Sequence, residues 1–114
     1  MQRPQWLIGL LTLAVTLTAA LVYAADPPTE LTLILEKHRF NPEEIQVKAN
    51  APFVLIITNK DNEDEDFEMA ALRIDKTIPA GKTVSVKMPG LKPGTYEFIG
   101  EFHDKTAKGR ILAK

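Results

Sequence analysis

The segment Gly94–Gly109, GTYEFIGEFHDKTAKG, decides how the fold of this chain is interpreted. Its aromatic residues Tyr96 and Phe98 alternate with smaller or polar residues, which is the period of a strand with one buried face. The strand leads through Gly100 to a histidine, His103, in a short loop. Histidine is a common metal ligand, but a histidine in a loop is by itself more simply explained as a surface residue. The chain contains no cysteine to accompany it.

Outward from this segment, the chain repeats short runs of apolar residues separated by turn signals. Period-two runs bounded by Pro and Gly predict strands that each bury one face. About seven such runs predict an all-β sandwich, and no helical periodicity appears beyond the N-terminal segment. The expected strands lie near residues 31–35, 45–47, 53–58, 67–71, 84–88, 96–98 and 110–113, with breakers at Asn41-Pro42, Pro79–Gly81, Pro89-Gly90 and Pro93-Gly94.

The N-terminus has the pattern of a secretory signal peptide. One positive charge precedes the apolar run Trp6–Val22, and small residues follow near Ala24. The alternative is an uncleaved membrane anchor, although the run is short for a span of about 20 residues. We therefore expect export to the periplasm. The expected division is a signal peptide at 1–24, a linker at 25–30 and one domain at 31–114.

Composition excludes several classes of function. With 14 Lys and Arg against 15 Asp and Glu, the formal net charge is −1. This balance argues against nucleic acid as a partner, because nucleic acid requires a basic face. The only serine, Ser85, lies within an expected strand, and no H-E-x-x-H or phosphate-binding glycine loop occurs. Any enzymatic activity would therefore be metal redox chemistry.

Several motifs occur in a characteristic order along the chain. They are Phe40-Asn41-Pro42, Glu44–Ala49, Asn59-Lys60-Asp61, Pro79–Thr83 and Leu91–Tyr96. In this order, and together with Gly94–Gly109, they resemble the cupredoxins, the family that holds blue copper. The resemblance implies a Greek-key β-sandwich. Gly100 stands where those proteins carry the ligating cysteine, so a type-1 blue copper site is excluded.

A subgroup without that cysteine is more similar still. Glu65–Glu68 and Gly100–Gly109 resemble the cupredoxin domains of bacterial iron uptake, including EfeO-type proteins and small cupredoxins encoded beside iron permeases. This resemblance implies a role in iron uptake, with an inner-membrane iron permease or another periplasmic protein as partner. One departure is Met69–Ala71, which replaces a Ser-His-Asp sequence found in many members.

Four residues are candidate metal ligands. His103 stands at a ligand position of the family, and Glu65 stands where the first histidine ligand of blue copper proteins is expected. Strand parity turns Glu65 inward, while Glu101 and His38 are expected near the same end of the sandwich. Such nitrogen and oxygen donors suit Cu(II), Fe or Mn, and we expect a copper or iron ion.

Each candidate also has a plainer interpretation. His103 and His38 are also explained as surface histidines, and His38 is flanked by two basic residues. Glu65 belongs to the acidic run Asp61–Glu68, which is typical of a solvated loop. Met69 is better explained as a core residue.

Three functions remain open at this stage. The first is metal binding in an iron-uptake system, through Fe(II) oxidation or through delivery of iron or electrons to a permease. The second is a metal-free interaction module that docks to a transporter component. The third is an exported copper chaperone. It is less well supported, because such a function calls for clusters of Met or His, and only Met69 and Met88 follow the expected signal peptide.

Overall fold

The computed structural model describes residues 2, 12–18 and 27–114. The expected signal peptide at 1–24 therefore lies largely outside the described residues. Within the described part, no helix is long and apolar enough to cross a membrane. The remaining chain forms one β-sandwich, as the alternating pattern predicts.

Nine strands and two short 3₁₀ helices make up the domain. They are β1 (Thr29–Glu36), β2 (Arg39–Asn41), β3 (Glu44–Val47), β4 (Phe53–Asn59), β5 (Glu65–Met69), η1 (Ala70–Leu72), β6 (Ile74–Ile78), β7 (Thr83–Met88), β8 (Gly94–Gly100), η2 (Glu101–His103) and β9 (Lys108–Ala113).

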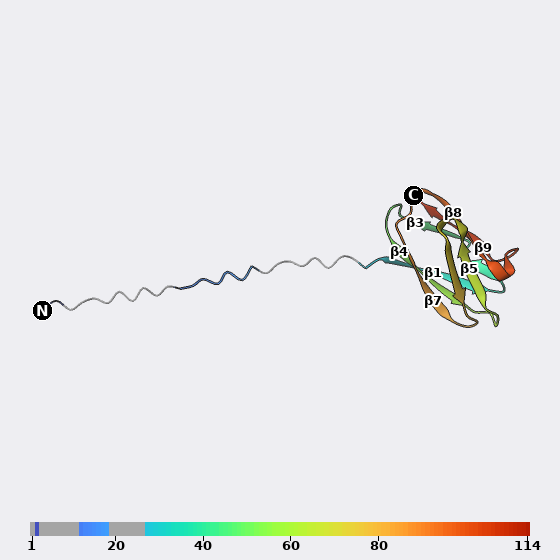
Figure 1. Cartoon of the computed structure of the whole chain (residues 1–114), viewed down its shortest axis with the longest axis horizontal. Helices are drawn as coiled ribbons and strands as arrows, with labels where there is room; N and C mark the ends of the chain where they lie inside the picture. The colour runs from blue at the N-terminus through green and yellow to red at the C-terminus, as the bar shows by residue number, and fades with distance from the viewer. Residues whose placement is uncertain (1, 3–11, 19–26) are drawn as a thin grey trace.

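The strands form two sheets packed face to face (Figure 1). The first sheet has the order β2-β1-β4-β7, and the second has the order β3-β9-β8-β5-β6. Two pairs are parallel, β1 with β4 and β3 with β9, and the other neighbours are antiparallel. The parallel pairs bring residues far apart in the sequence to the same end of the sandwich.

The core lies between the inward faces of the two sheets. β4 and β5 alternate strictly, with every second side chain buried. Phe40 packs edge-on against both Phe67 and Phe98, at ring-centroid distances of 6.1 and 5.2 Å. Edge-to-face aromatic packing of this kind adds to the stabilisation from burial. Met69 is fully buried, so its interpretation as a core residue is confirmed.

Three details differ from the sequence prediction. β2 and β6 were not expected, because β2 is only three residues long and β6 is an edge strand with mostly exposed side chains. Ala71 was expected in a strand, but β5 ends at Met69 and η1 follows. The linker was expected to extend to Glu30. β1 instead begins at Thr29, since backbone pairing with β4 does not require apolar side chains.

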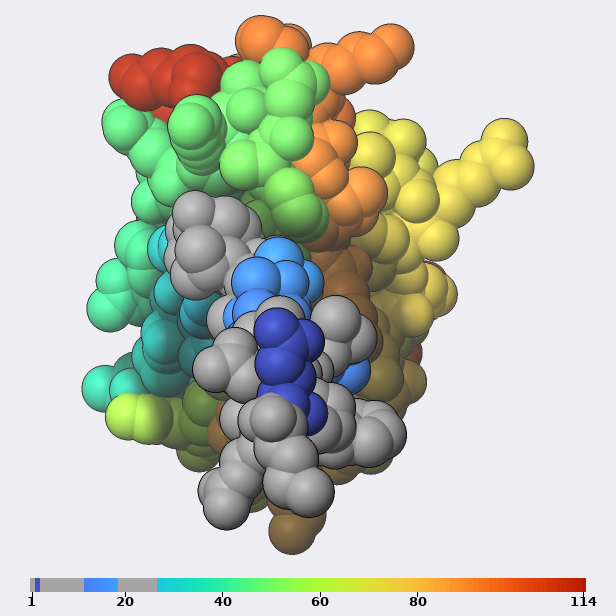
Figure 2. All heavy atoms as spheres, turned by 90° about the vertical axis from the view of Figure 1, so that its left-hand side faces the viewer, coloured from blue at the N-terminus to red at the C-terminus, as the bar shows by residue number. Residues whose placement is uncertain are grey.

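The two ends of the sandwich are closed differently. At the end seen in Figure 2, the chain near Asn50 (green) meets the chain near Leu91 (orange), and the Asn50 N–H donates to the Leu91 carbonyl at 2.7 Å. The opposite end receives the last residues of β1, β4 and β8 and the segments that follow them. These segments carry both histidines of the chain.

Candidate metal centre

His38 lies in a tight turn between β1 and β2. Both Lys37 and His38 have positive φ values, of 53° and 56°, which are uncommon for residues other than glycine. The Asp61 carboxylate accepts the backbone N–H groups of Lys37 at 2.7 Å and of His38 at 2.9 Å. These two bonds fix the turn and therefore the position of the His38 side chain.

The motif Asn59-Lys60-Asp61 fixes the neighbouring loop. The buried Asn59 amide donates to the carbonyls of Glu63 at 2.8 Å and Ile78 at 2.9 Å, and its oxygen accepts the Asp61 N–H at 2.9 Å. Asn59 thus holds the backbone that carries Glu63, while Asp61 holds the turn that carries His38. The structure explains this motif as the support for two side chains of one site.

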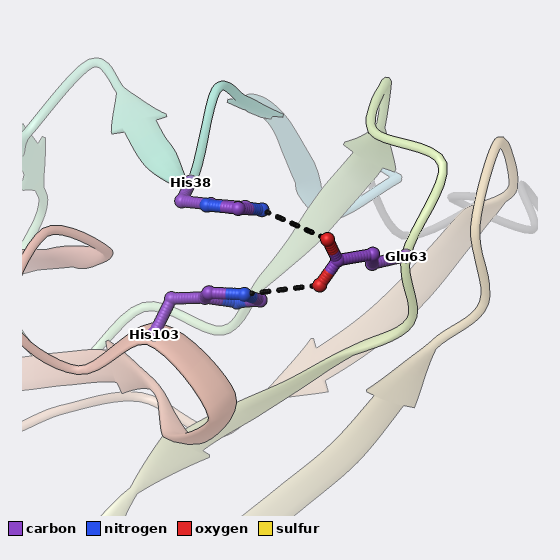
Figure 3. Close-up of side chains that lie close together, drawn as sticks. All are labelled: His38, Glu63 and His103. Carbon is purple, nitrogen blue, oxygen red and sulfur yellow. Dashed lines mark ion pairs between the residues drawn. The ribbon is translucent and has the colours of Figure 1, made fainter.

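Three side chains converge at this end: His38, Glu63 and His103 (Figure 3). One donor atom from each lies within 4.8 Å of the others. Nε2 of His103 is 3.2 Å and Nε2 of His38 is 3.8 Å from the Glu63 carboxylate. The two imidazole rings stack with their centroids 3.6 Å apart and their planes at 10°. Two nitrogen donors and one carboxylate therefore lie close together at the surface.

The other side of His103 faces the interior of the sandwich. Its Nδ1 lies 2.6 Å from Oε2 of Glu65, whose side chain is only 1% exposed. Oε1 of Glu65 accepts the backbone N–H groups of Phe102 at 2.8 Å and Asp66 at 3.0 Å. A buried carboxylate with three donors is fully satisfied.

Glu65 also changes the protonation of its neighbour. The hydrogen bond to Glu65 raises the pKa of His103 above its usual 6.5, and the negative charges of Glu65 and Glu63 add to the rise, while burial opposes it. Neighbouring carboxylates favour the charged imidazolium in this way. A proton on His103 would therefore compete with a metal ion for this side chain.

Gly100 makes room for the Glu65 carboxylate. A Cβ atom at position 100 would lie 2.6 Å from Cδ of Glu65 and 2.8 Å from Cβ of Ala107. Contacts this short require neighbouring atoms to move. The volume that a side chain at position 100 needs is therefore taken by Glu65.

Glu101 lies in a different cluster, with Asp66 and Asp75. One carboxylate oxygen from each of the three lies within 4.8 Å of the others. The pKa of Asp75 is raised, first by its hydrogen bond with Asp66, and also by burial and by the Asp66 charge. This group contains carboxylates alone.

The structure therefore divides the four residues that the sequence singled out. It brings His38 and His103 together, places Glu65 behind His103, and places Glu101 with other acids. It adds Glu63, which sequence reasoning missed. Period-two parity could not single out Glu63, because this residue lies in a loop, among several other carboxylates. Its one signal was its place two residues after Asp61 of the Asn59–Asp61 motif.

Comparison with known proteins agrees with this architecture. The family model of the cupredoxin-like domain matches residues 7–113. The chain belongs to the cupredoxin-like domain family. It is also similar to an uncharacterized protein of Rickettsia prowazekii (strain Madrid E), with 33% identity over 87 residues, covering 76% of this chain and 70% of the relative.

Solved cupredoxins share the fold at low sequence identity. Auracyanin A, a blue copper protein from Chloroflexus aurantiacus, aligns with a TM-score of 0.67 and 15% identity, over 77% of this chain and all of the other. The metal-binding domain of the Cu(I)-exporting ATPase CopA of Streptococcus pneumoniae D39 aligns with a TM-score of 0.68 and 16% identity, over 81% and 91% of the two chains. The expected cupredoxin-like sandwich is confirmed.

Proposed function

We propose that this protein binds a copper or iron ion through His38, Glu63 and His103. The observation that carries the proposal is the convergence of their donor atoms at one end of the sandwich. The cupredoxin-like fold supports it, since copper-binding proteins share this fold.

The donor set fits such an ion. Imidazole nitrogen and carboxylate oxygen suit Cu(II) and iron, and a chain without cysteine offers no thiolate for a blue copper centre. His38 and His103 contribute neutral nitrogen donors, while Glu63 contributes a negative charge that partly neutralises the cation. When bound, copper supplies a one-electron redox couple.

The site is accessible from solvent. Glu63 is 58% exposed, His38 is 38% exposed and His103 is 21% exposed. An ion at this position exchanges with ligands outside the protein more readily than one held in the core. Exchange of this kind suits a protein that receives and passes on its ion.

The proposed cellular role is in iron uptake from the periplasm. The chain would either assist oxidation of Fe(II) or deliver iron or electrons to an inner-membrane permease. Support comes from the resemblance of Asn59–Glu68 and Gly100–Gly109 to the cysteine-free cupredoxins of iron uptake. A neighbouring gene for an iron permease would favour this role, whereas a neighbouring copper efflux pump would favour a copper chaperone.

Calorimetric titration of the purified protein with Cu(II) and with Fe(III) tests the binding site. We expect one-to-one binding by the wild type, which His103→Ala removes. Glu63→Gln should weaken binding about tenfold or more, because losing a ligand costs at least as much as losing a supporting partner of a ligand.

Glu101→Gln is the matched control, since it removes the same charge from a residue outside the convergent group. Its affinity should remain close to that of the wild type. Unchanged binding by His103→Ala would contradict the proposed site. Equal losses in Glu63→Gln and Glu101→Gln would show that the acidic surface attracts cations without a defined ligand set.

A further inference from the structure

The two ring nitrogens of His103 face two different carboxylates. Nδ1 faces buried Glu65 at 2.6 Å, and Nε2 faces exposed Glu63 at 3.2 Å. A neutral imidazole carries its hydrogen on one nitrogen and a lone pair on the other. Only the nitrogen with the lone pair is able to bind a metal ion. The ligand atom of His103 is therefore decided by where its hydrogen resides.

The surroundings of Glu65 decide this question. Its Oε1 is occupied by the N–H groups of Asp66 and Phe102, which only donate hydrogen bonds. Its Oε2, as a carboxylate oxygen, accepts only, so the short contact with Nδ1 requires the hydrogen on Nδ1. The lone pair of the neutral ring is then on Nε2, which faces Glu63, while His38 stacks against the face of the same ring.

We propose that Glu65 is a positioning residue that keeps the hydrogen of His103 on Nδ1 and makes Nε2 the metal-binding atom, so that the ion is held on the outer side of the ring. This inference rests on the proposed function, because it names the ligand atom of the same site. Hydrogen bonding of the second ring nitrogen to a carboxylate is a common way to orient a metal-binding histidine.

The packing around Gly100 also supports metal binding on the outer side of the His103 ring. A Cβ atom there would lie 2.6 Å from Cδ and 2.9 Å from Oε2 of Glu65, and 2.8 Å from Cβ of Ala107. The inner side of His103 is therefore filled by the carboxylate itself. On the outer side, Glu63 faces Nε2, and both Glu63 and His38 are partly exposed.

Nitrogen-15 NMR of the metal-free protein tests the hydrogen position directly. At a pH at which His103 is neutral, the chemical shifts of its two ring nitrogens should show the tautomer with the hydrogen on Nδ1. Zn(II) is then added as a diamagnetic probe. The Nε2 resonance of His103 should move by direct ligation, while its Nδ1 keeps its hydrogen.

The Glu65→Gln variant tests whether Glu65 sets the hydrogen position of His103 or only supports the surrounding structure. The oxygen of the new side-chain amide must remain on the two backbone N–H groups, so its NH₂ group faces Nδ1 and donates a hydrogen bond. The hydrogen of the imidazole is then displaced to Nε2. We expect the tautomer signature to switch and Zn(II) affinity to fall about 10- to 100-fold.

Glu68→Gln is the matched control. Glu68 lies on the same strand but on the opposite face, where it pairs in register with Asp75. The same chemical change there should leave both the tautomer and the affinity unchanged.

The outcomes distinguish this inference from the proposed function. A hydrogen on Nε2 in the wild type, or Zn(II) ligation through Nδ1, would overturn the inference even though the protein binds metal. Absence of any bound ion would overturn the proposed function and the ligand part of the inference. The metal-free tautomer would still decide whether Glu65 sets the ring. If Glu65→Gln does not fold, the two wild-type spectra decide alone.

Discussion

Glu63 and Glu65 are two residues apart and contact the same imidazole, yet their surroundings differ sharply. Glu65 is 1% exposed and accepts three hydrogen bonds, whereas Glu63 is 58% exposed and faces two histidine rings. The inner carboxylate holds two backbone N–H groups and the His103 ring in place through its hydrogen bonds. The outer carboxylate contacts the two exposed-side ring nitrogens, which agrees with its proposed role as a metal ligand.

The largest expected effect of this difference is on stability. Glu65→Ala empties a buried site and leaves three partly buried donors without their acceptor, so we expect a loss of about 3–5 kcal/mol in the free energy of unfolding of the metal-free protein. Glu63→Ala should cost no more than about 1 kcal/mol, since exposed ion pairs contribute little. Urea unfolding with unchanged m values measures both. Equal losses in the two variants would remove the distinction between the inner and outer carboxylates.

A smaller effect is expected at Gly100. Gly100→Ala places a methyl group against the Glu65 carboxylate and Ala107, and overpacking of this kind costs about 1–3 kcal/mol. The Gly100 φ of −92° suits any residue, so the cost comes from contact and not from backbone strain.

A double-mutant cycle identifies the contact responsible for this cost. In a Glu65→Ala background, the cost of Gly100→Ala should fall, because the nearest obstructing atoms are gone. An unchanged cost would show that the steric overlap is with Ala107. It would weaken the argument that Glu65 fills the space on the inner side of His103.

The smallest expected effect is a dependence of stability on pH. The pKa of His103 is higher in the folded chain than its usual 6.5, mainly through Glu65. Stabilisation by the protonated ring is therefore complete below about pH 6.5 and is lost as the pH rises through the folded-state pKa. Urea unfolding of the metal-free protein over a pH series into the alkaline range measures this decline.

The two histidines provide the control for this experiment. His103→Gln should flatten the decline, whereas His38→Gln should preserve it. A decline that persists in His103→Gln would assign the pH dependence to other groups.

Much of the fold was predictable because strand patterning is local. The continuous apolar, β-branched run at residues 53–58 predicted β4. The alternation at residues 67–69 predicted β5 and the inward direction of Glu65, and all three predictions are confirmed. β6 was missed because it lies at a sheet edge, where only its end residues Ile74 and Ile78 pack against the core and the three residues between them are exposed and polar. The candidate site was predicted less completely, since its residues lie in loops where side-chain direction follows no period.

The sequence by itself determined the class of fold, the absence of a thiolate ligand and the presence of two histidines near one end of a sandwich. The tertiary structure alone decided which donors meet. Asn59 and Asp61 fix two loops from separate parts of the chain, and through them Glu63 and His38 reach His103. The direction of the His103 ring depends on Glu65, which is 38 residues away in sequence. Such contacts depend on how the two sheets pack, and no local pattern of residues records that packing.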